Sequence, residues 1–153
     1  DISNISSLEI LQEPSVFREL ISEMSSSQII NNSDAIISID ARGFIFGSAI
    51  SLYSSKPMIV ARKPGKLPGE IIERNYNLEY GNNSLSIQKK ALKKFDNFAI
   101  VDDLLATGGT VCCVANLLKG NNKKISGLLT VVELKKLGGR SEFDFPVESS
   151  ILI

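Results

Sequence analysis

The chain has 153 residues, 43% hydrophobic and 22% charged, which is typical of one soluble globular domain with a substantial core. Its 17 basic and 17 acidic residues cancel, so no net charge draws it to nucleic acid or to an anionic membrane, and any anion must be bound by a local site. No apolar run approaches the roughly 20 residues that span a bilayer, and no signal peptide is recognisable. We therefore expect a cytoplasmic protein without nucleic-acid or membrane partners.

Two residue types narrow the possible chemistry. Histidine is absent, which excludes Ser-His and Cys-His nucleophiles and every histidine-containing metal site. The two cysteines, Cys112 and Cys113, are adjacent, which excludes a disulfide framework and favours a reducing compartment.

Strands and helices are predicted to alternate along the chain. Helical spacing of apolar residues predicts a helix at 14–24, and further helices are expected at 43–54 and 110–119. Short β-rich runs predict buried strands at 34–40, 57–62, 97–103, 125–134 and within 148–153. This alternation predicts a single α/β domain over residues 1–153, with a mainly parallel twisted sheet flanked by helices on both faces.

Two segments interrupt the alternation. Residues 63–70 contain two prolines, two glycines and two lysines, a composition that predicts a mobile loop. Residues 75–81 and 84–88 alternate in polarity around Gly81, Asn82 and Asn83, which predicts a β-hairpin turning at these three residues.

The stretch AIVDDLLATGGTV, residues 99–111, holds the clearest candidate site. Asp102 and Asp103 end the strand at 97–103, and residues 104–109 are predicted to turn into the next helix. Ligands of open α/β sheets bind beyond the carboxyl ends of the strands, and a helix N-terminus attracts anions. We infer a phosphate on residues 106–110 and sugar hydroxyls on the two carboxylates. The alternative is a solvated Asp pair before an ordinary tight turn.

Several motifs carry a family resemblance. IVDDLLATGGT resembles the phosphoribosyl pyrophosphate signature of the type I phosphoribosyltransferases, and DDLLATGGT is similar to the version in members that act on adenine. Four further matches follow the family's order: ARGFIFG (41–47), RKPGKLPGE (62–70), LEYG (78–81) and VVEL (131–134) with a Leu-Gly-Gly segment after it. The resemblance implies a type I fold with a β-hairpin and flexible loop over the site.

The resemblance also implies an activity, which is transfer of the phosphoribosyl group to adenine, giving AMP and pyrophosphate. Mg²⁺ would be bound mainly through the substrate's pyrophosphate rather than by metal ligands of the chain, and the protein would be a homodimer. Asp102 and Asp103 would bind the ribose hydroxyls beside a transition state of oxocarbenium character. Glu79 would assist proton transfer at adenine N7 or N9, and Tyr80 would orient the loop.

The same resemblance assigns the substrate contacts. Arg42 lies where the pyrophosphate is expected, and a cis peptide bond is implied between Asp40 and Ala41. Leu104 is a candidate for one wall of the purine slot. The remaining substrate-binding residues are expected on two loops, the basic loop (residues 62–70) and the phosphate loop (residues 106–110). They are Arg62, Lys63, Lys66, Ala106, Thr107, Gly108, Gly109 and Thr110.

Three alternatives accompany this interpretation. Family members carry a purine-covering stretch ahead of the segment that Asp1-Ile2-Ser3 resembles, and we expect it to be missing here, which leaves another base (hypoxanthine, xanthine or guanine) open. A regulatory module could also bind phosphoribosyl pyrophosphate without catalysis. A methyltransferase-like nucleotide-binding domain is disfavoured, because no glycine-rich turn follows residues 35–40.

Overall fold

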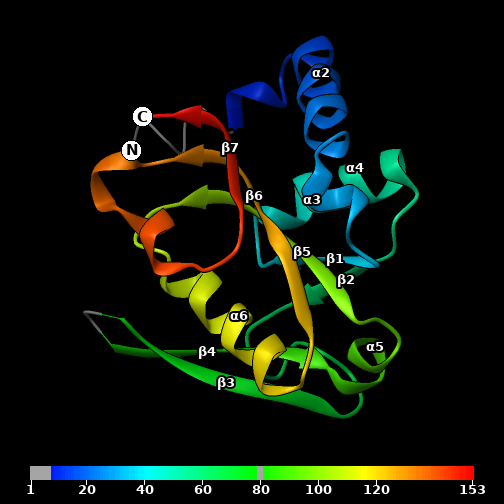
Figure 1. Ribbon diagram of the computed structural model, residues 1–153, viewed down its shortest axis with the longest axis vertical. Helices are drawn as coiled ribbons and strands as arrows, with labels where there is room; N and C mark the ends of the chain where they lie inside the picture. The colour runs from blue at the N-terminus through cyan, green and yellow to red at the C-terminus, as the bar shows by residue number, and fades with distance from the viewer. Residues whose placement is uncertain (1–7, 79–80) are drawn as a thin grey trace.

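The computed structural model describes residues 8–78 and 81–153. Its centre is a five-stranded sheet in the order β2-β1-β5-β6-β7, in which every neighbouring pair is parallel (Figure 1). These strands are β1 (Ala35–Ile39), β2 (Met58–Ala61), β5 (Asn97–Leu105), β6 (Lys124–Glu133) and β7 (Val147–Leu152). The predicted parallel sheet is therefore confirmed.

Helices cover both faces of this sheet, as predicted. One face carries α2 (Pro14–Ser25), α3 (Gln28–Asn31) and α4 (Gly43–Ser54), and the opposite face carries α6 (Gly109–Gly120) (Figure 1). The predicted helices match α2, α4 and α6 to within a residue at each end. The short helices α3 and α5 (Lys89–Lys93) were not predicted, because four or five residues are too few to show a helical period.

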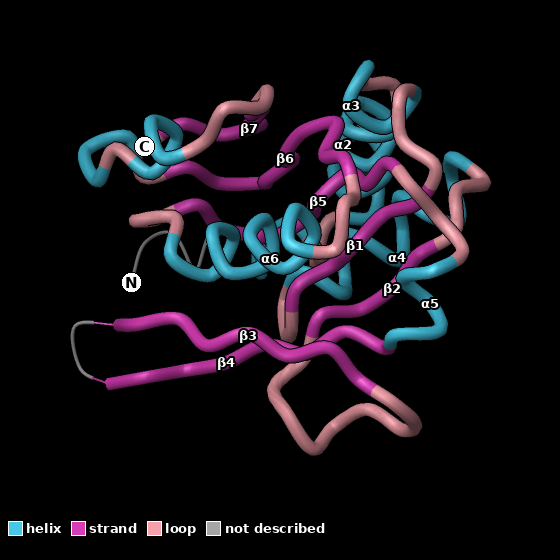
Figure 2. The backbone as a smooth tube through the Cα atoms, turned by 60° about the horizontal axis from the view of Figure 1, so that its bottom comes forward, coloured by secondary structure: helices cyan, strands magenta, loops and turns pink. Residues whose placement is uncertain are grey.

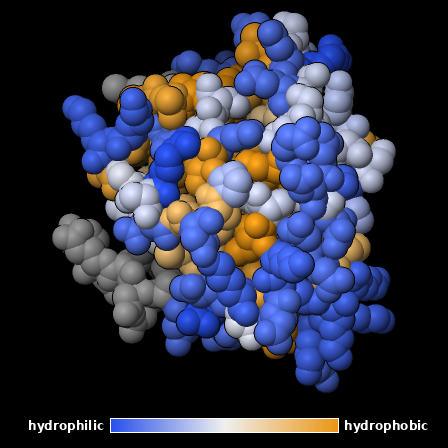
Figure 3. All heavy atoms as spheres, viewed as in Figure 1, coloured by the Kyte–Doolittle hydropathy of each residue, from blue (hydrophilic) through white to orange (hydrophobic). Residues whose placement is uncertain are grey.

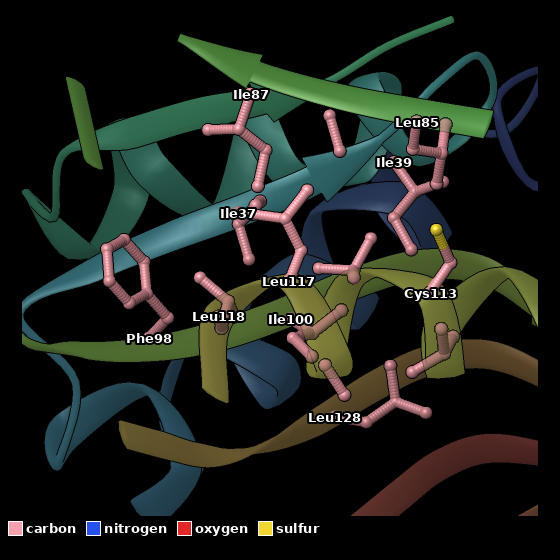
Figure 4. Close-up of a cluster of buried hydrophobic side chains, with 14 of the residues drawn as sticks. Ile37, Ile39, Leu85, Ile87, Phe98, Ile100, Cys113, Leu117, Leu118 and Leu128 are labelled. Carbon is pink, nitrogen blue, oxygen red and sulfur yellow. The ribbon is translucent and has the colours of Figure 1, made fainter. Parts of the chain in front are cut away.

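The core has two layers, because neighbouring residues of each central strand face opposite sides of the sheet. On one side, Ile37 of β1 and Ile100 of β5 pack with Leu117 and Leu118 of α6 and with Ile87, which lies above α6 (Figure 4). The other layer joins the remaining strand residues to the helices of the opposite face: Ile36, Val101, Leu129, Met24, Phe46 and Ile50. Burial on both faces explains why the strands read as continuous apolar runs.

Strand β5 is longer than predicted. Leu104 pairs with Val132 of β6 and Leu105 pairs with Glu133, so the ladder continues two residues beyond Asp103. The prediction that Leu104 and Leu105 belong to the turn is therefore wrong, and only residues 106–108 connect β5 to α6.

The predicted hairpin is present, but its turn is displaced. Strands β3 (Ile71–Leu78) and β4 (Gly81–Gln88) pair from Ile71 with Gln88 to Leu78 with Gly81. Residues 81–83, predicted as the turn, are therefore part of β4. The ladder is anchored at its other end, where β4 buries Leu85 and Ile87 in the core, and this register extends the strand to Gly81.

The hairpin lies beside α6 on the face away from the sheet (Figure 2). Residues 63–70 precede it without helix or strand, as predicted. Around α5 the surface is hydrophilic, with Lys89, Lys90 and Lys93 exposed, whereas apolar side chains show at the centre of the face in Figure 3. None of the described helices is both long and apolar enough to span a membrane.

Candidate active site

Two adjacent carboxylates stand at the carboxyl end of β5. The backbone N–H of Asp103 donates to Oδ1 of Asp102 at 2.8 Å. Asp103 is only 5% exposed, and its Oδ2 lies 2.8 Å from Nε of Arg42. This contact is an ion pair without the directionality of a hydrogen bond, since Oδ2 has no hydrogen-bond partner among the described residues. Arg42 thus brings one positive charge against the pair.

The environment makes the charged form of Asp102 unfavourable. Burial raises the pKa of Asp102 well above its usual value of 3.8, and the negative charge of Asp103 raises it further. The hydrogen bond from the Asp103 backbone and the charge of Arg42 act in the opposite direction but are weaker. A carboxylate held in this way favours a ligand that donates hydrogen bonds or develops positive charge beside it.

The loop after β5 is shaped to approach an anion closely. Gly108 has φ +93°, a conformation that residues with a Cβ rarely adopt, and a Cβ there would lie 3.1 Å from Cζ of Phe143. Helix α6 begins at Gly109, and its first turn leaves backbone N–H groups without partners inside the helix. These groups and the helix dipole favour an anion at this end of α6.

The loop between β1 and α4 meets the same point. The peptide bond between Asp40 and Ala41 is cis, which confirms the expectation drawn from the family resemblance. Helix α4 starts at Gly43, where a Cβ would lie 3.0 Å from Oδ1 of Asp102. The absence of a side chain at Gly43 therefore allows the start of α4 to approach the carboxylates.

Together the two loops enclose a pocket of about 250 Å³, lined by Asp40, Ala41, Arg42 and residues 102–111. The structure thus brings together most of the residues that the sequence indicated: Arg42, Asp102, Asp103, Leu104, Ala106, Thr107, Gly108, Gly109 and Thr110. Sequence reasoning missed Asp40, although its position at the end of a predicted strand was a usable signal.

The basic loop is not part of this pocket. Nε of Arg62 donates to Oδ2 of Asp40 at 3.0 Å, and its guanidinium lies 5.7 Å from the centre of the Phe44 ring. Lys63 and Lys66 are exposed and do not line the pocket. Glu79 and Tyr80 lie outside the described residues. A substrate role for these five residues therefore stays a prediction.

The sequence and the fold match a known family. The model of the family described as phosphoribosyl transferase domain matches residues 6–150, and the chain belongs to this family. Two curated relatives from Prochlorococcus marinus, both named adenine phosphoribosyltransferase, are close in sequence. The relative from strain MIT 9312 is 70% identical over 95% of this chain and 85% of its own length. The relative from subspecies pastoris is 72% identical over 93% of this chain and 83% of its own length. The chain therefore groups with the adenine phosphoribosyltransferases of that family.

Solved structures agree. Adenine phosphoribosyltransferase from Thermoanaerobacter pseudethanolicus superposes with a TM-score of 0.85 at 34% identity, covering 94% of this chain and 84% of its own. The enzyme from Saccharomyces cerevisiae, solved with adenine and an imino-altritol bisphosphate, gives 0.84 at 33% identity and the same coverage.

Proposed function

We propose that this protein transfers the phosphoribosyl group of phosphoribosyl pyrophosphate to adenine, giving AMP and pyrophosphate for purine salvage. The observation that carries the proposal is a pocket in which a carboxylate pair, a helix N-terminus and Arg42 converge. Each feature suits one part of the sugar substrate, and curated relatives at 70% and 72% identity are named for this activity.

The 5-phosphate would bind at the start of α6. Backbone N–H groups of residues 106–110 and the hydroxyls of Thr107 and Thr110 can donate to its oxygens, and Gly108 and Gly109 leave room for close approach. The anion would be oriented by these fixed donors before any reaction takes place.

The carboxylates would act on the sugar. Asp102 and Asp103 can accept hydrogen bonds from the ribose hydroxyls, and their charge is most favourable when the sugar carbon becomes cationic. In the reaction the C1–O bond to pyrophosphate breaks, the bond from C1 to adenine N9 forms, and the N9 proton is lost. Glu79 is the residue we assign to that proton, and Leu104 would form one wall of the adenine slot. No protein nucleophile is required, in agreement with a chain that lacks histidine.

The leaving pyrophosphate would be bound by Arg42, which lines the pocket and whose Nε lies 2.8 Å from Oδ2 of Asp103. Arg62, Lys63 and Lys66 would add positive charge when the loop at 63–70 closes, and Tyr80 would orient that loop. Closure would exclude water, which could otherwise hydrolyse the activated sugar.

The pocket also fits Mg²⁺ bound mainly through the substrate. Mg²⁺ prefers oxygen ligands, and carboxylates of Asp40, Asp102 and Asp103 line the pocket in which the substrate's phosphates would bring the ion. The described residues contain no cluster of three metal-ligating side chains, and Mg²⁺ usually completes its shell with phosphates and water. When bound, the ion would neutralise the departing pyrophosphate.

We further expect a cytoplasmic homodimer. Side chains on α2 and α4 expose apolar surface that a partner copy could cover, with Leu52 86% exposed and Tyr53 58% exposed. The adjacent free thiols of Cys112 and Cys113 suit a reducing compartment. Analytical ultracentrifugation would test the oligomeric state.

The activity is tested by mixing the protein with Mg²⁺, phosphoribosyl pyrophosphate and one base at a time: adenine, hypoxanthine, guanine, xanthine or orotate. We expect pyrophosphate release and AMP with adenine. Turnover with another base instead would change the assigned substrate. Binding of phosphoribosyl pyrophosphate without turnover on any base would favour the regulatory module.

A further inference from the structure

A short segment, residues 138–143, lies directly behind the phosphate loop. Gly139 is buried in it, and a Cβ at that position would overlap the carbonyl oxygen of Ala106 and lie 3.1 Å from the carbonyl carbon of Thr107. At the far end of the segment, the ring of Phe143 lies so near Gly108 that a Cβ added to this glycine would be 3.1 Å from Cζ of the ring. Residues 138–143 therefore pack against the phosphate loop on its side away from the pocket, and they do not line the pocket themselves.

One ion pair ties this segment to the sheet. Arg140, next to Gly139, donates from Nε to Oε2 of Glu133 at 3.1 Å and from Nη2 to Oε1 at 2.7 Å. Its Nη1 also donates to the carbonyl of Val147 at 2.8 Å, so a single guanidinium connects the segment to both β6 and β7. This forked geometry is the most directional one open to an Arg–carboxylate pair.

The carboxylate of this pair is fixed as well. The side chain of Glu133 is only 6% exposed, and Oε1 accepts a further hydrogen bond from Oγ of Ser149 at 2.7 Å. The hydroxyls of Thr130 and Ser149 lie 2.9 Å apart and extend the network along β6 and β7. Hydrogen bonds from Arg140 keep the pKa of Glu133 below its usual range, so the pair remains charged at neutral pH.

We propose that Glu133 and Arg140 are positioning residues for phosphate binding, which hold residues 138–143 against the phosphate loop and thereby fix the backbone N–H groups that receive the 5-phosphate. The inference rests on the proposed function for the identity of the ligand. Neither residue lines the pocket formed by residues 40–42 and 102–111, so we expect loss of the pair to weaken binding of the sugar phosphate through the displaced loop and to leave adenine binding unaffected. Misplacement of the donors by a fraction of an ångström is enough to lower affinity.

The test compares Arg140→Met with the parent protein. We expect the KM for phosphoribosyl pyrophosphate and the calorimetric Kd for ribose 5-phosphate to rise by about 10-fold, with the KM for adenine unchanged within about 2-fold. Arg140→Lys keeps the charge without the fork and should recover part of the loss. Lys119→Met is the matched control, because it removes the exposed pair of Lys119 with Asp144, one residue beyond the segment, and should change neither constant.

A second variant perturbs the same contact from the other side. Gly139→Ala leaves Glu133 and Arg140 intact but pushes on Ala106, and it should reproduce the selective loss of phosphate binding. Equal increases in both KM values, or lower stability to urea with phosphate binding unchanged, would overturn the positioning role. Should Arg140→Met fail to fold, unchanged ribose 5-phosphate binding in Gly139→Ala and Arg140→Lys would overturn it as well. A parent protein that binds ribose 5-phosphate but forms no AMP would refute the proposed activity alone.

Discussion

Replacing Asp102 with Asn tests two effects of this carboxylate separately, its effect on the free energy of unfolding and its effect on kcat. The substitution keeps the size of the side chain and an Oδ1 atom that can still accept from the backbone N–H of Asp103, a contact of 2.8 Å. What it removes is the negative charge beside Asp103. The expected result is a more stable and much slower enzyme.

The sign of the stability change follows from the raised pKa. Because burial raises the pKa of Asp102 above 3.8 in the folded state, the folded protein binds this proton more tightly than the unfolded chain does. The free energy of unfolding therefore falls as pH rises from about 3.8 to the raised pKa, and the full penalty persists above it. A tenfold difference in proton affinity between the folded and unfolded states corresponds to about 1.4 kcal/mol.

Asp102 is half-buried at the edge of an open pocket, so solvent screens part of this penalty. We expect Asp102→Asn to increase the free energy of unfolding by on the order of 1 kcal/mol at pH 7.5, which would raise Tm by about 2–4 °C in a domain of this size. The gain should vanish below about pH 3.8, where both states of the parent are protonated.

Turnover should move in the opposite direction. In the proposed reaction the charge of Asp102 would lie beside the sugar carbon that becomes cationic, and loss of one preorganised electrostatic contact costs about 10²–10³ in kcat. Binding of the ground-state sugar phosphate should change less, because its hydroxyls can still donate to the amide oxygen.

Urea unfolding at a series of pH values and steady-state kinetics on the same preparations measure both effects. Asp103→Asn is the comparison: it should lower turnover similarly, but it also removes the 2.8 Å ion pair between Arg42 and Asp103 and should not stabilise the protein. An Asp102→Asn protein that is equally or less stable than the parent at pH 7.5 would refute the electrostatic argument. Unchanged kcat in both variants would refute the catalytic role.

Two further predictions concern the loop and the packing of α4. Limited proteolysis should cut first within residues 63–70, because this loop is loosely packed: a Cβ added at Gly65 or Gly69 would meet no atom within 4 Å. Phosphoribosyl pyrophosphate should slow this cleavage. Early cuts elsewhere that the ligand does not affect would argue against a closing loop. Gly47→Ala should lower the free energy of unfolding by about 1–3 kcal/mol, since its Cβ would overlap Oγ of Ser38. In urea unfolding Ser38→Gly should restore part of that loss, and Ser48→Ala on the exposed side of α4 should change stability by less than about 0.5 kcal/mol; an equal effect of both alanines would contradict the overlap.

The parts of the molecule that could be predicted are those set by consecutive residues. Apolar runs bounded by turn residues predicted the parallel sheet and its three long helices, because burial on both faces requires such runs. The phosphate loop could be predicted for the same reason, since Asp102 to Thr110 form a strand end, a turn and a helix start without a gap. Sequence separation explains most of the failures. The turn of the β3–β4 hairpin was misplaced because its register is set by Leu85 and Ile87 in the core, not by the glycine and asparagines near its tip.

Arg42, Arg62 and Arg140 show why the remaining parts needed the structure. Arg42 and Arg62 lie within motifs that carry the family resemblance, which implied substrate binding for both, and Arg140 follows the Leu-Gly-Gly segment. In the folded protein Arg42 reaches Asp103 at the pocket, Arg62 is engaged by Asp40 and lies near Phe44, and Arg140 forms its fork with Glu133. Which carboxylate an arginine meets depends on where two loops or strands converge, and no local pattern records that. The positive charge of each arginine could be read from the sequence, whereas the convergence of the loops and strands in the fold decided which carboxylate each one meets.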